Sequence, residues 1–376
     1  MNDRLNMQNS IAKLLDNVTV EWKALGEVAE IANNTRKPVK ASLRIQGKIP
    51  YYGANNIQDY VEGYTHNGEY VLIAEDGSAN LKNYSIQWAT GKFWANNHVH
   101  IVQSMPELNN RFLYHYLRNM NFIPYLTGGD RAKLTKSSLI QITIPIPPLH
   151  IQTEIVRILD TFSALTAELT AELTAELTTR KKQYNYYRNK LLAFKEDEVE
   201  WKLINEFASL KRGIRVTRNQ LSQKNGYHVY QNSLIPLGYY EKANTQENTT
   251  FIISAGAAGE IGYSSEKFWA ADDCFYFECS RNLLNRYLFY VLKNKQEYIS
   301  SQVRRSSIPR LPRAIIEKLK IPIPPLEEQT RIVEILDKFD ALTNSITEGL
   351  PREIALRQKQ YEYYRNLLLN FSVETQ

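Results

Sequence analysis

The chain repeats itself at a fixed distance, and this repeat constrains the fold more than any other feature. The sequence Ile-Pro-Ile-Pro-Pro-Leu at 144–149 returns at 321–326, and the segment at 182–192 returns in diverged form at 359–369. Both pairs are 177 residues apart, so no residue was inserted or lost between them. Upstream, Glu21-Trp22-Lys23 pairs with Glu200-Trp201-Lys202, 179 residues later. Two copies of one unit predict two domains of the same fold, each followed by a segment that diverged less than the domain.

Each Pro-rich stretch is followed by a segment that predicts a long helix. Residues 152–194 contain neither Gly nor Pro, which predicts one helix of about 43 residues. Thr-Ala-Glu-Leu occurs three times within it, at 166–177. Four residues turn a helix by ~400°, so the leucines drift by only ~40° per unit and share one face. The leucines of this spacer face are Leu165, Leu169, Leu173 and Leu177.

A continuous leucine face predicts a packing partner for the helix. We expect this partner to be the helical segment of the second copy, which is interrupted at 349–351 and has the same overall length. The two helices would run antiparallel if a pseudo-twofold axis relates the copies. The alternative is that each helix lies on its own globular domain.

The sequence of each globular copy predicts a mixed α/β domain. Short aromatic and β-branched runs at 49–56, 70–74 and 98–102 indicate strands, and 111–117 and 286–292 indicate amphipathic helices. The predicted fold class is therefore α+β, with two duplicated α/β domains separated by two long antiparallel helices. The expected boundaries are 1–149 for the first domain, 150–195 for the first helix, 196–326 for the second domain and 327–376 for the second helix.

Positive charge is confined to the two predicted domains. Residues 21–149 hold 13 Lys and Arg against 10 Asp and Glu, and residues 200–326 hold 18 against 11. The helical segments are acidic, with seven against eight at 150–199 and six against nine at 327–376. This division predicts two separate surfaces for a polyanion such as nucleic acid.

A basic loop lies between the amphipathic helix and the Pro-rich stretch in each copy, at 127–136 and 304–313. Lys, Arg and exposed backbone N–H groups are the groups that hold a nucleic-acid backbone. The predicted phosphate contacts are Arg131, Lys133, Lys136, Arg304, Arg305, Arg310 and Arg313. The alternative is a basic loop that only solvent contacts.

Amide and acid side chains in predicted turns are candidates for reading DNA bases. Asn pairs with adenine N6 and N7, and Asp accepts a hydrogen bond from cytosine N4. The candidates are Asn55, Asn56, Asn96, Asn97, Gln231, Asn232, Asp272 and Asp273. We match the pair Asp272-Asp273 to Asn96-Asn97, and an amide can be neither a general base nor a carboxylate ligand of Mg²⁺. A shared catalytic role is therefore not expected, and an ordinary turn at a strand end is the alternative.

Known catalytic motifs are missing from the sequence. It has no G-x-x-x-x-G-K-[ST], H-E-x-x-H or G-x-S-x-G and no dinucleotide-binding glycine loop. Cys274 and Cys279 are expected to be buried apolar side chains, because one C-x4-C pair cannot complete a zinc site. His98 and His100 share a strand face without a nearby carboxylate or Cys, and the other histidines, His66, His115, His150 and His228, look incidental. No apolar run of ~18 residues and no export signal is present, so we expect a cytoplasmic protein.

These motifs together resemble a known family. Each basic domain is followed by Ile-Pro-Ile-Pro-Pro-Leu and then by Gln-Thr-x-Ile-Val-x-Ile-Leu-Asp-x-Phe, at 152–162 and 329–339. This arrangement resembles, over the whole chain, the specificity subunit of a type I DNA restriction-modification system. The Thr-Ala-Glu-Leu repeats and the Gln-Tyr-x-Tyr-Tyr-Arg sequence at 183–188 resemble the IC subgroup of that family.

The resemblance implies a non-catalytic, sequence-specific DNA-binding subunit. Each domain would be a target-recognition domain for one half of a bipartite sequence in double-stranded DNA, and the helices would hold the domains apart. The implied partners are two modification subunits, which carry S-adenosylmethionine chemistry, and restriction subunits, which use ATP and Mg²⁺. No cofactor is implied in this chain.

The ends of the two helices carry a repeated face that is a candidate for partner binding. Its residues recur at i, i+3, i+4 and i+7, so they share one face, and a duplicated face recruits two identical partners. The residues are Tyr184, Tyr187, Arg188 and Leu191 in the first copy and Tyr361, Tyr364, Arg365 and Leu368 in the second. The alternative is that this face closes the helix pair.

Two other functions remain open at this point. A self-contained DNA methyltransferase would need a glycine loop for S-adenosylmethionine and an (Asp/Asn/Ser)-Pro-Pro-(Tyr/Phe) motif, but Ile146 and Ile323 precede the Pro-Pro pairs. The chain could also be a helical scaffold that does not read DNA sequence. In that case the excess of positive charge in the two domains would have no function. Salt-dependent binding to duplex DNA distinguishes this scaffold from a specificity subunit.

Overall fold

The computed structural model describes residues 2–128, 132–305, 307–344 and 349–371, and the chain divides into two compact units. The first unit combines Met1–Ala171 with Ala355–Gln376, and the second is Glu172–Ile354. Each unit therefore holds one globular domain and parts of both helical segments. The predicted α+β fold with two repeated domains is confirmed, although the compact units follow boundaries different from those of the sequence repeat.

The first domain is built on a six-stranded sheet in the order β2-β7-β5-β6-β3-β4. Alternate residues of its central strands enter two cores, so that Val71 and Ile73 pack under α3 while Leu72 packs on the other face. The strands predicted at 70–74 and 98–102 are found as β5 and β7, whereas the run at 49–56 contains the end of β3, a turn and the first residue of β4. Its elements are α1 (Asn2–Leu15), β1 (Glu21–Ala24), α2 (Leu25–Val28), β2 (Ala29–Ile31), β3 (Gln46–Gly53), β4 (Asn56–Val61), β5 (His66–Ala74), β6 (Ile86–Ala95), β7 (Val99–Ser104), α3 (Asn110–Asn119), α4 (Lys136–Ile140) and β8 (Thr143–Ile146).

The second domain repeats this topology with one strand divided. The place of β6 is taken by two short strands, β14 and β15, so the sheet separates into β10-β16-β13-β14 and β12-β11-β15. Cys274 is buried in β16, as predicted, whereas Cys279 at the end of the strand is only half-buried. Its elements are β9 (Glu200–Leu203), α6 (Ile204–Phe207), β10 (Ala208–Arg212), β11 (Tyr227–Tyr230), β12 (Tyr239–Tyr240), β13 (Thr249–Ile253), β14 (Ile261–Ser264), β15 (Trp269–Ala270), β16 (Cys274–Cys279), α7 (Asn285–Asn294), α8 (Gln296–Ser301), α9 (Arg313–Glu317) and β17 (Lys320–Ile323).

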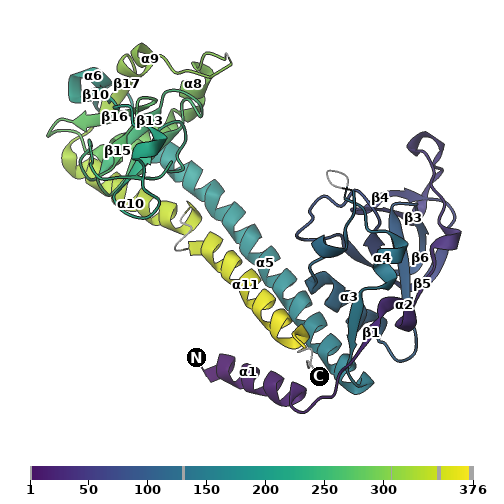
Figure 1. Ribbon diagram of the computed structural model, residues 1–376. Helices are drawn as coiled ribbons and strands as arrows, with labels where there is room; N and C mark the ends of the chain where they lie inside the picture. The colour runs from purple at the N-terminus through teal and green to yellow at the C-terminus, as the bar shows by residue number, and fades with distance from the viewer. Residues whose placement is uncertain (1, 129–131, 306, 345–348, 372–376) are drawn as a thin grey trace. The chain divides into compact units, whose positions relative to one another are not determined.

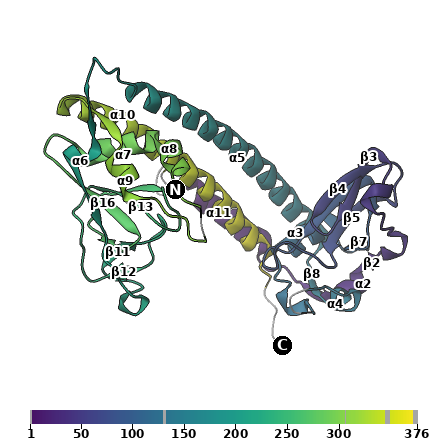
Figure 2. The ribbon, with the colours of Figure 1, turned by 90° about the horizontal axis from the view of Figure 1, so that it is seen from above.

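The long helix predicted after the first domain is α5 (Leu149–Leu191), 43 residues long. The second helical segment contains α10 (Leu326–Asn344) and α11 (Gly349–Leu369). In the first unit the early part of α5 and the late part of α11 lie side by side (Figures 1 and 2). Ser163 Oγ donates to the Tyr361 hydroxyl at 3.0 Å, and the rings of Phe162 and Tyr364 are 5.4 Å apart. The residue number of the contact on α11 falls as the residue number on α5 rises. The two helices therefore run antiparallel there, as expected.

The leucine face of the Thr-Ala-Glu-Leu repeats is only partly covered. Leu165 is 49% exposed, and Leu169, Leu173 and Leu177 are half-buried. The two compact units meet in the chain between Ala171 and Glu172, inside these repeats. The repeats therefore form the stretch of α5 that passes from one unit to the other.

A buried glutamine joins each domain to its helix. The Gln152 amide accepts from Asn109 N at 2.7 Å and donates to the carbonyls of Glu107 and Pro147. Gln329 makes the same three hydrogen bonds in the second unit, to Leu284 N, Asn282 O and Pro324 O. Both side chains are fully buried with all of these groups satisfied, so they clamp the Pro-rich stretch and the helix start to the domain.

A second clamp lies about two helical turns further along each helix, eight residues after the glutamine. Arg111 of α3 holds Asp160 of α5 at 2.8 Å, and Arg286 of α7 holds Asp337 of α10 at 2.7 Å. His115, which is buried, bonds to Asp160 at 2.8 Å, whereas Tyr290 takes its place and donates to Asp337 in the second unit. His115 looked incidental in the sequence, but it belongs to this clamp.

We expect acidification from pH 7 to pH 5 to destabilise the first unit through His115. Burial lowers the pKa of His115 to about 4, although the bond to Asp160 opposes this shift. Between pH 6.5 and 4 the unfolded chain therefore binds more protons than the folded one, so stability falls with falling pH, by about 2 kcal/mol at pH 5. Hydrogen exchange of α3 peptides measures this loss.

The variant His115→Tyr, which introduces the residue that the second unit carries, is the matched control. It should remove most of this pH dependence from the α3 peptides, because a tyrosine does not titrate in this range. An equal pH dependence in the variant and the native chain would show that another group is responsible.

Candidate DNA interface

Lys133 of the basic loop meets Arg36, a residue that the sequence did not single out, at Glu75 at one end of the sheet of the first domain. Arg36 donates to Glu75 at 2.7 Å, and Lys133 from the basic loop pairs with the same carboxylate at 2.9 Å. Arg36 also donates to the carbonyls of Asn97 and Val99. Burial alone would raise the pKa of Glu75, but the hydrogen bonds from Arg36 and Lys133 outweigh it, and the pKa lies below its ordinary value. Glu75 thus holds three loops together as a carboxylate.

The second domain forms the same loop arrangement without this acid. Thr127 and Lys133 close the first basic loop by two backbone hydrogen bonds, and Arg304 and Arg310 close the second in the same way. Leu134 N donates to Glu75 O, and its counterpart Leu311 N donates to Ser254 O. Ser254 therefore takes the place of Glu75, so Arg310 lacks the carboxylate that Lys133 has.

The predicted phosphate contacts separate into exposed and internally paired cations. Lys136, Arg304, Arg305 and Arg310 are exposed, and none of them forms an ion pair with the residues that the structure describes. Arg313 is paired differently, because it donates to Leu210 O and to Glu317, each at 2.7 Å. Lys133 and Arg313 are thus held by their own domains. Arg131 lies outside the described residues.

The base-reading candidates of the first domain are also divided between exposed and internally bonded side chains. The Asn55 amide is occupied by Gly77 O and Ala79 N, at 2.6 and 2.8 Å. Asn96 is buried and accepts from His98 N at 2.8 Å. Both therefore serve turns, which was the alternative explanation. Asn56, with φ of 100°, and Asn97 are exposed at the same end of the sheet.

In the second domain Gln231 and Asp272 lie together, with Gln231 Nε2 3.4 Å from Asp272 Oδ1. Asn232 is exposed beside them, and its carbonyl accepts from Ala257 N at 2.9 Å. Asp273 is half-buried at the start of β16, where its carbonyl accepts from Ser254 N. The second-domain candidates thus gather near the basic loop, because Ala255 bridges to Arg310.

The sequence match of Asp272-Asp273 to Asn96-Asn97 was wrong by one residue. Asn96 N donates to Tyr52 O, and the equivalent bond in the second domain runs from Ala271 N to Tyr230 O. Glu75 N donates to His98 O, and Ser254 N donates to Asp273 O. Asp272 and Asp273 therefore correspond to Asn97 and His98. The backbone hydrogen bonds establish this alignment. A short sequence match that contains a gap is not sufficient to establish it.

Sequence reasoning missed a tryptophan in each domain that positions a segment other than the basic loop. Trp94 Nε1 donates to Lys37 O at 2.7 Å, and Trp269 Nε1 donates to Ile214 O at 2.8 Å. These bonds hold the segments that begin at Arg36 and Gly213 against the parallel strand pairs β3·β6 and β11·β15. The repeated Phe-Trp-Ala sequence at 93–95 and 268–270 was the available signal.

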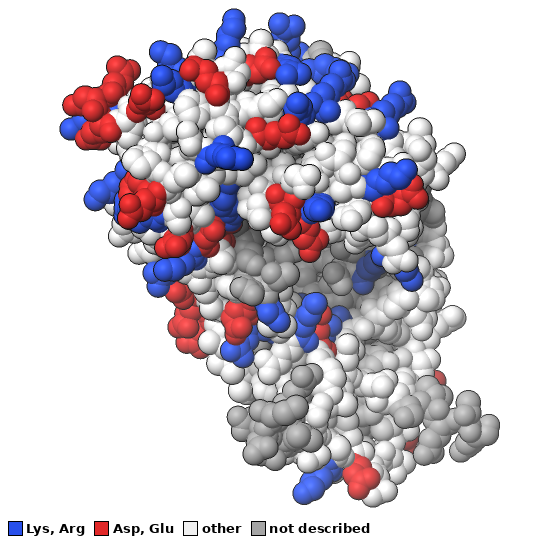
Figure 3. Space-filling model, turned by 90° about the vertical axis from the view of Figure 1, so that its left-hand side faces the viewer, with Lys and Arg blue, Asp and Glu red and all other residues white. Residues whose placement is uncertain are grey.

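Charge alone does not mark the interface. Lys and Arg alternate with Asp and Glu over the face shown in Figure 3. Within the described parts of the chain, His, Cys, Asp and Glu form no group of three that suits a metal ion. Among the same residues, each helix is too short or too polar to cross a membrane.

The candidate partner-binding face is partly internal. Tyr184, Tyr364 and Leu368 are buried in the cores of the two units, so the structure does not offer these three side chains to a partner. Tyr187 is 41% exposed and stacks on Phe339, with ring centroids 5.3 Å apart. Arg188, Leu191, Tyr361 and Arg365 are half-buried.

Comparisons with known proteins agree with the duplicated architecture. The family model described as the type I restriction modification DNA specificity domain matches the chain twice, at 17–179 and 196–356. A Haemophilus influenzae protein named as a type I restriction enzyme specificity subunit is 53% identical, covering 98% of this chain and all of that protein. The EcoR124I/EcoR124II specificity subunit of Escherichia coli is 35% identical over 96% of each chain.

A solved structure shows the same fold at low identity. The crystal structure of a type I restriction-modification S subunit from M. genitalium aligns with a TM-score of 0.61 at 17% identity, over 96% of this chain and 99% of that one. The family model covers most of this chain, and two relatives cover nearly all of it at 53% and 35% identity. The chain therefore belongs to the family of type I restriction-modification DNA specificity subunits.

Proposed function

We propose that this chain directs a type I restriction-modification enzyme to a bipartite DNA sequence, with each globular domain reading one half. One observation carries this proposal: the same set of loops gathers at the same end of both domains, closed by the same backbone bonds but bearing different side chains. A shared scaffold with different side chains is what reading two different half-sites requires.

The proposed readers are the polar side chains, exposed or half-buried, at these loop ends. They are Asn56, Asn97, Gln231, Asn232, Asp272 and Asp273. The proposed phosphate contacts are Lys136, Arg304, Arg305 and Arg310, together with Arg131 from the sequence alone. Phosphate contacts fix the register of each domain on the duplex, and the readers then discriminate bases.

The proposal assigns the chemistry to partner subunits. Two modification subunits would supply methyl transfer with S-adenosylmethionine, and restriction subunits would supply ATP- and Mg²⁺-dependent cleavage. The exposed Tyr187 with Arg188 and Leu191, and the partly exposed Tyr361 with Arg365, are proposed as partner contacts. Tyr187→Ala should weaken capture of a modification subunit in a pull-down. Unchanged capture would mean that the face only closes the helix packing.

Lys133 is paired with an acid and Arg310 is not, so variants of these two residues test which cations contact DNA phosphates. Arg310→Gln should weaken binding to all duplex sequences and reduce the slope of log K against log salt by about one, because one phosphate contact is lost. Lys133→Gln should change this slope much less, because Glu75 already neutralises Lys133. Fluorescence anisotropy of labelled duplexes between 50 and 200 mM salt, with the assembled complex, measures both slopes.

Three results of that titration would count against this assignment. Equal slope changes for the two variants would mean that the ion pair opens on DNA. A loss confined to one base position would make Arg310 a base reader. Binding that does not depend on salt would instead favour a scaffold without DNA readout.

A further inference from the structure

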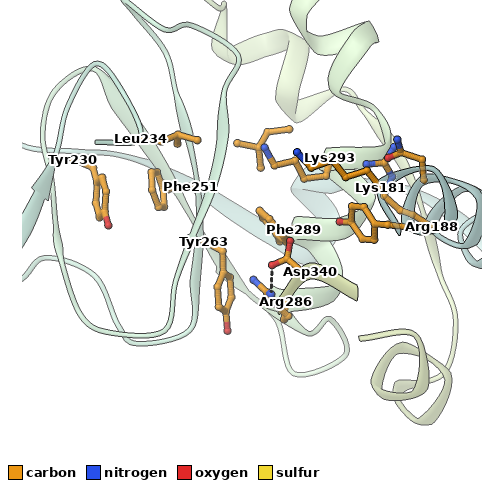
Figure 4. Close-up of a pocket in the computed structure, with 14 residues that line it drawn as sticks. Lys181, Arg188, Tyr230, Leu234, Phe251, Tyr263, Arg286, Phe289, Lys293 and Asp340 are labelled. Carbon is orange, nitrogen blue, oxygen red and sulfur yellow. Dashed lines mark hydrogen bonds and ion pairs between the residues drawn. The ribbon is translucent and has the colours of Figure 1, made fainter. Parts of the chain in front are cut away.

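A cavity of about 680 Å³ in the second unit is lined by three cations that have no ionic partner among the described residues. Lys181 and Arg188 reach it from α5, and Lys293 reaches it from α7 (Figure 4). None of the three forms an ion pair with the residues that the structure describes. The single acid in the lining, Asp340, is paired with Arg286 at 3.2 Å.

Two of these cations are partly removed from water. Arg188 and Lys293 are half-buried, and Arg188 Nε is a buried donor without a hydrogen-bond partner among the described residues. Burial lowers the pKa of Lys293, and the nearby Arg188 lowers it further, while Glu260 and Asp340 oppose the shift. Like charges gathered in a partly desolvated site oppose folding unless an anion joins them.

The first unit has only part of this arrangement. At the offset of the repeat, Lys181 corresponds to Gln358, which donates to Glu362 at 3.2 Å. Lys293 corresponds to Arg118 by the match of α3 with α7, and Arg118 donates to the Tyr114 hydroxyl at 3.0 Å. Arg188 corresponds to Arg365, whose Nε is also a buried donor without a partner among the described residues. The third cation, Lys181, is therefore what distinguishes the second unit.

The opposite end of the cavity is apolar. Figure 4 shows Tyr230, Leu234 and Phe251 there, away from Lys181 and Arg188. A cavity of this size suits a small ligand with one anionic end and one apolar end. Arg and Lys side chains bind phosphate through charge-assisted hydrogen bonds, and Arg188 offers a planar fork for two oxygens.

We propose that this cavity binds a nucleotide phosphate, held by Lys181, Arg188 and Lys293. Nucleotide phosphates come from two sources, a free nucleotide or the backbone of bound DNA, and the chemistry of the site is the same for both. Only the second source depends on the proposed function. Binding of a free phosphate compound does not require that the chain read DNA.

The test measures thermal unfolding and binding of the full chain with tripolyphosphate as the probe. Tripolyphosphate should bind saturably and raise the Tm of the native chain. Lys293→Met should weaken this binding by about tenfold or more, because a charge-assisted contact is lost. Without the probe, the same variant should unfold at an equal or higher temperature than the native chain, because it removes like-charge repulsion. A purely structural lysine would instead lower that temperature.

Matched variants separate the site from general charge effects. Lys182→Met removes an exposed lysine of the same helix that does not line the cavity, and it should leave the affinity for tripolyphosphate unchanged. Lys181→Met, at an exposed position where a folding defect is not expected, should weaken the affinity severalfold. Equal affinities of the Lys293→Met and Lys182→Met chains, or no saturable binding, would overturn the proposal.

Competition identifies the source of the phosphate. If duplex DNA displaces tripolyphosphate from the native chain, the site holds a backbone phosphate. If a saturating duplex leaves tripolyphosphate bound, the site holds a free nucleotide. A chain that binds tripolyphosphate through Lys293 but directs no modification to DNA would support this inference and contradict the proposed function.

Discussion

Replacing Gln329 with leucine is expected to lower the free energy of unfolding of the second unit by about 3 kcal/mol. The variant keeps the volume of the side chain but leaves Leu284 N, Asn282 O and Pro324 O without their partner in a dry site. Each buried group left unsatisfied costs about 1–3 kcal/mol, and partial relaxation reduces the sum. Hydrogen exchange of peptides from α7 and α10 should show the loss.

An exposed glutamine provides the control for this variant. Gln223→Leu lies on the surface of the same unit and should change stability by no more than about 0.5 kcal/mol. Gln152→Leu should reproduce the effect of Gln329→Leu in the first unit, because the three hydrogen bonds are the same. A loss below about 1 kcal/mol for Gln329→Leu would show that water replaces the amide and that the clamp is not required.

Deleting one Thr-Ala-Glu-Leu unit, 174–177, is expected to shorten the unread gap of the DNA target by one to two base pairs. Four residues correspond to ~6 Å of helix and ~40° of rotation, and a base pair spans ~3.4 Å. The half-buried leucines should keep their face, so both domains should stay folded. Both half-site sequences should therefore remain unchanged.

A one-residue deletion provides the contrast for the four-residue deletion. Removing Ala175 alone turns the following helix by ~100°, which displaces the leucines from their face and should impair assembly or activity. An unchanged gap after deletion of 174–177, or a changed half-site, would show that the repeats are a tolerated insertion and not a spacer. Sequencing of methylated sites in the host genome measures the gap directly.

The sequence predicted the features that depend on local pattern and repetition. The absence of Gly and Pro from 152–194 was sufficient for α5, and β-branched runs were sufficient for β3, β5 and β7. Repetition at a nearly constant offset, 175 to 179 residues, then indicated two copies of one domain. These predictions succeeded because periodicity and chain breakers act within a few residues of one another.

The details of the interface could not be predicted in the same way, because they depend on contacts between distant residues. Nothing local distinguishes Lys133 from Arg310, yet Lys133 pairs with Glu75, and Arg310 pairs with no acid among the described residues because Ser254 takes the place of Glu75. Asn55 and Asn96 look like base readers in the sequence, and only the structure shows that their amides support turns. Amide side chains serve turns and bases with the same hydrogen-bonding groups.

The packing of the helix ends could not be predicted from the sequence either. The repeat shows that Tyr184 and Tyr361 are equivalent, but it does not show which domain each helix end joins. In the structure the end of the first helix enters the core of the second unit, through Tyr184 and Leu192. The end of the second helix enters the core of the first unit, through Tyr364 and Leu368. Long-range exchange of this kind leaves no periodic signal in the sequence.

The most direct test of the proposed function is to sequence the methylated DNA motifs in a host that expresses this chain with its modification subunit. We predict one new motif made of two short specified blocks separated by a fixed number of unspecified base pairs. The motif should disappear when this chain is omitted. Exchanging residues 200–326 for the same region of a relative should change one block and preserve the other. A continuous motif, or methylation that does not depend on this chain, would contradict the account.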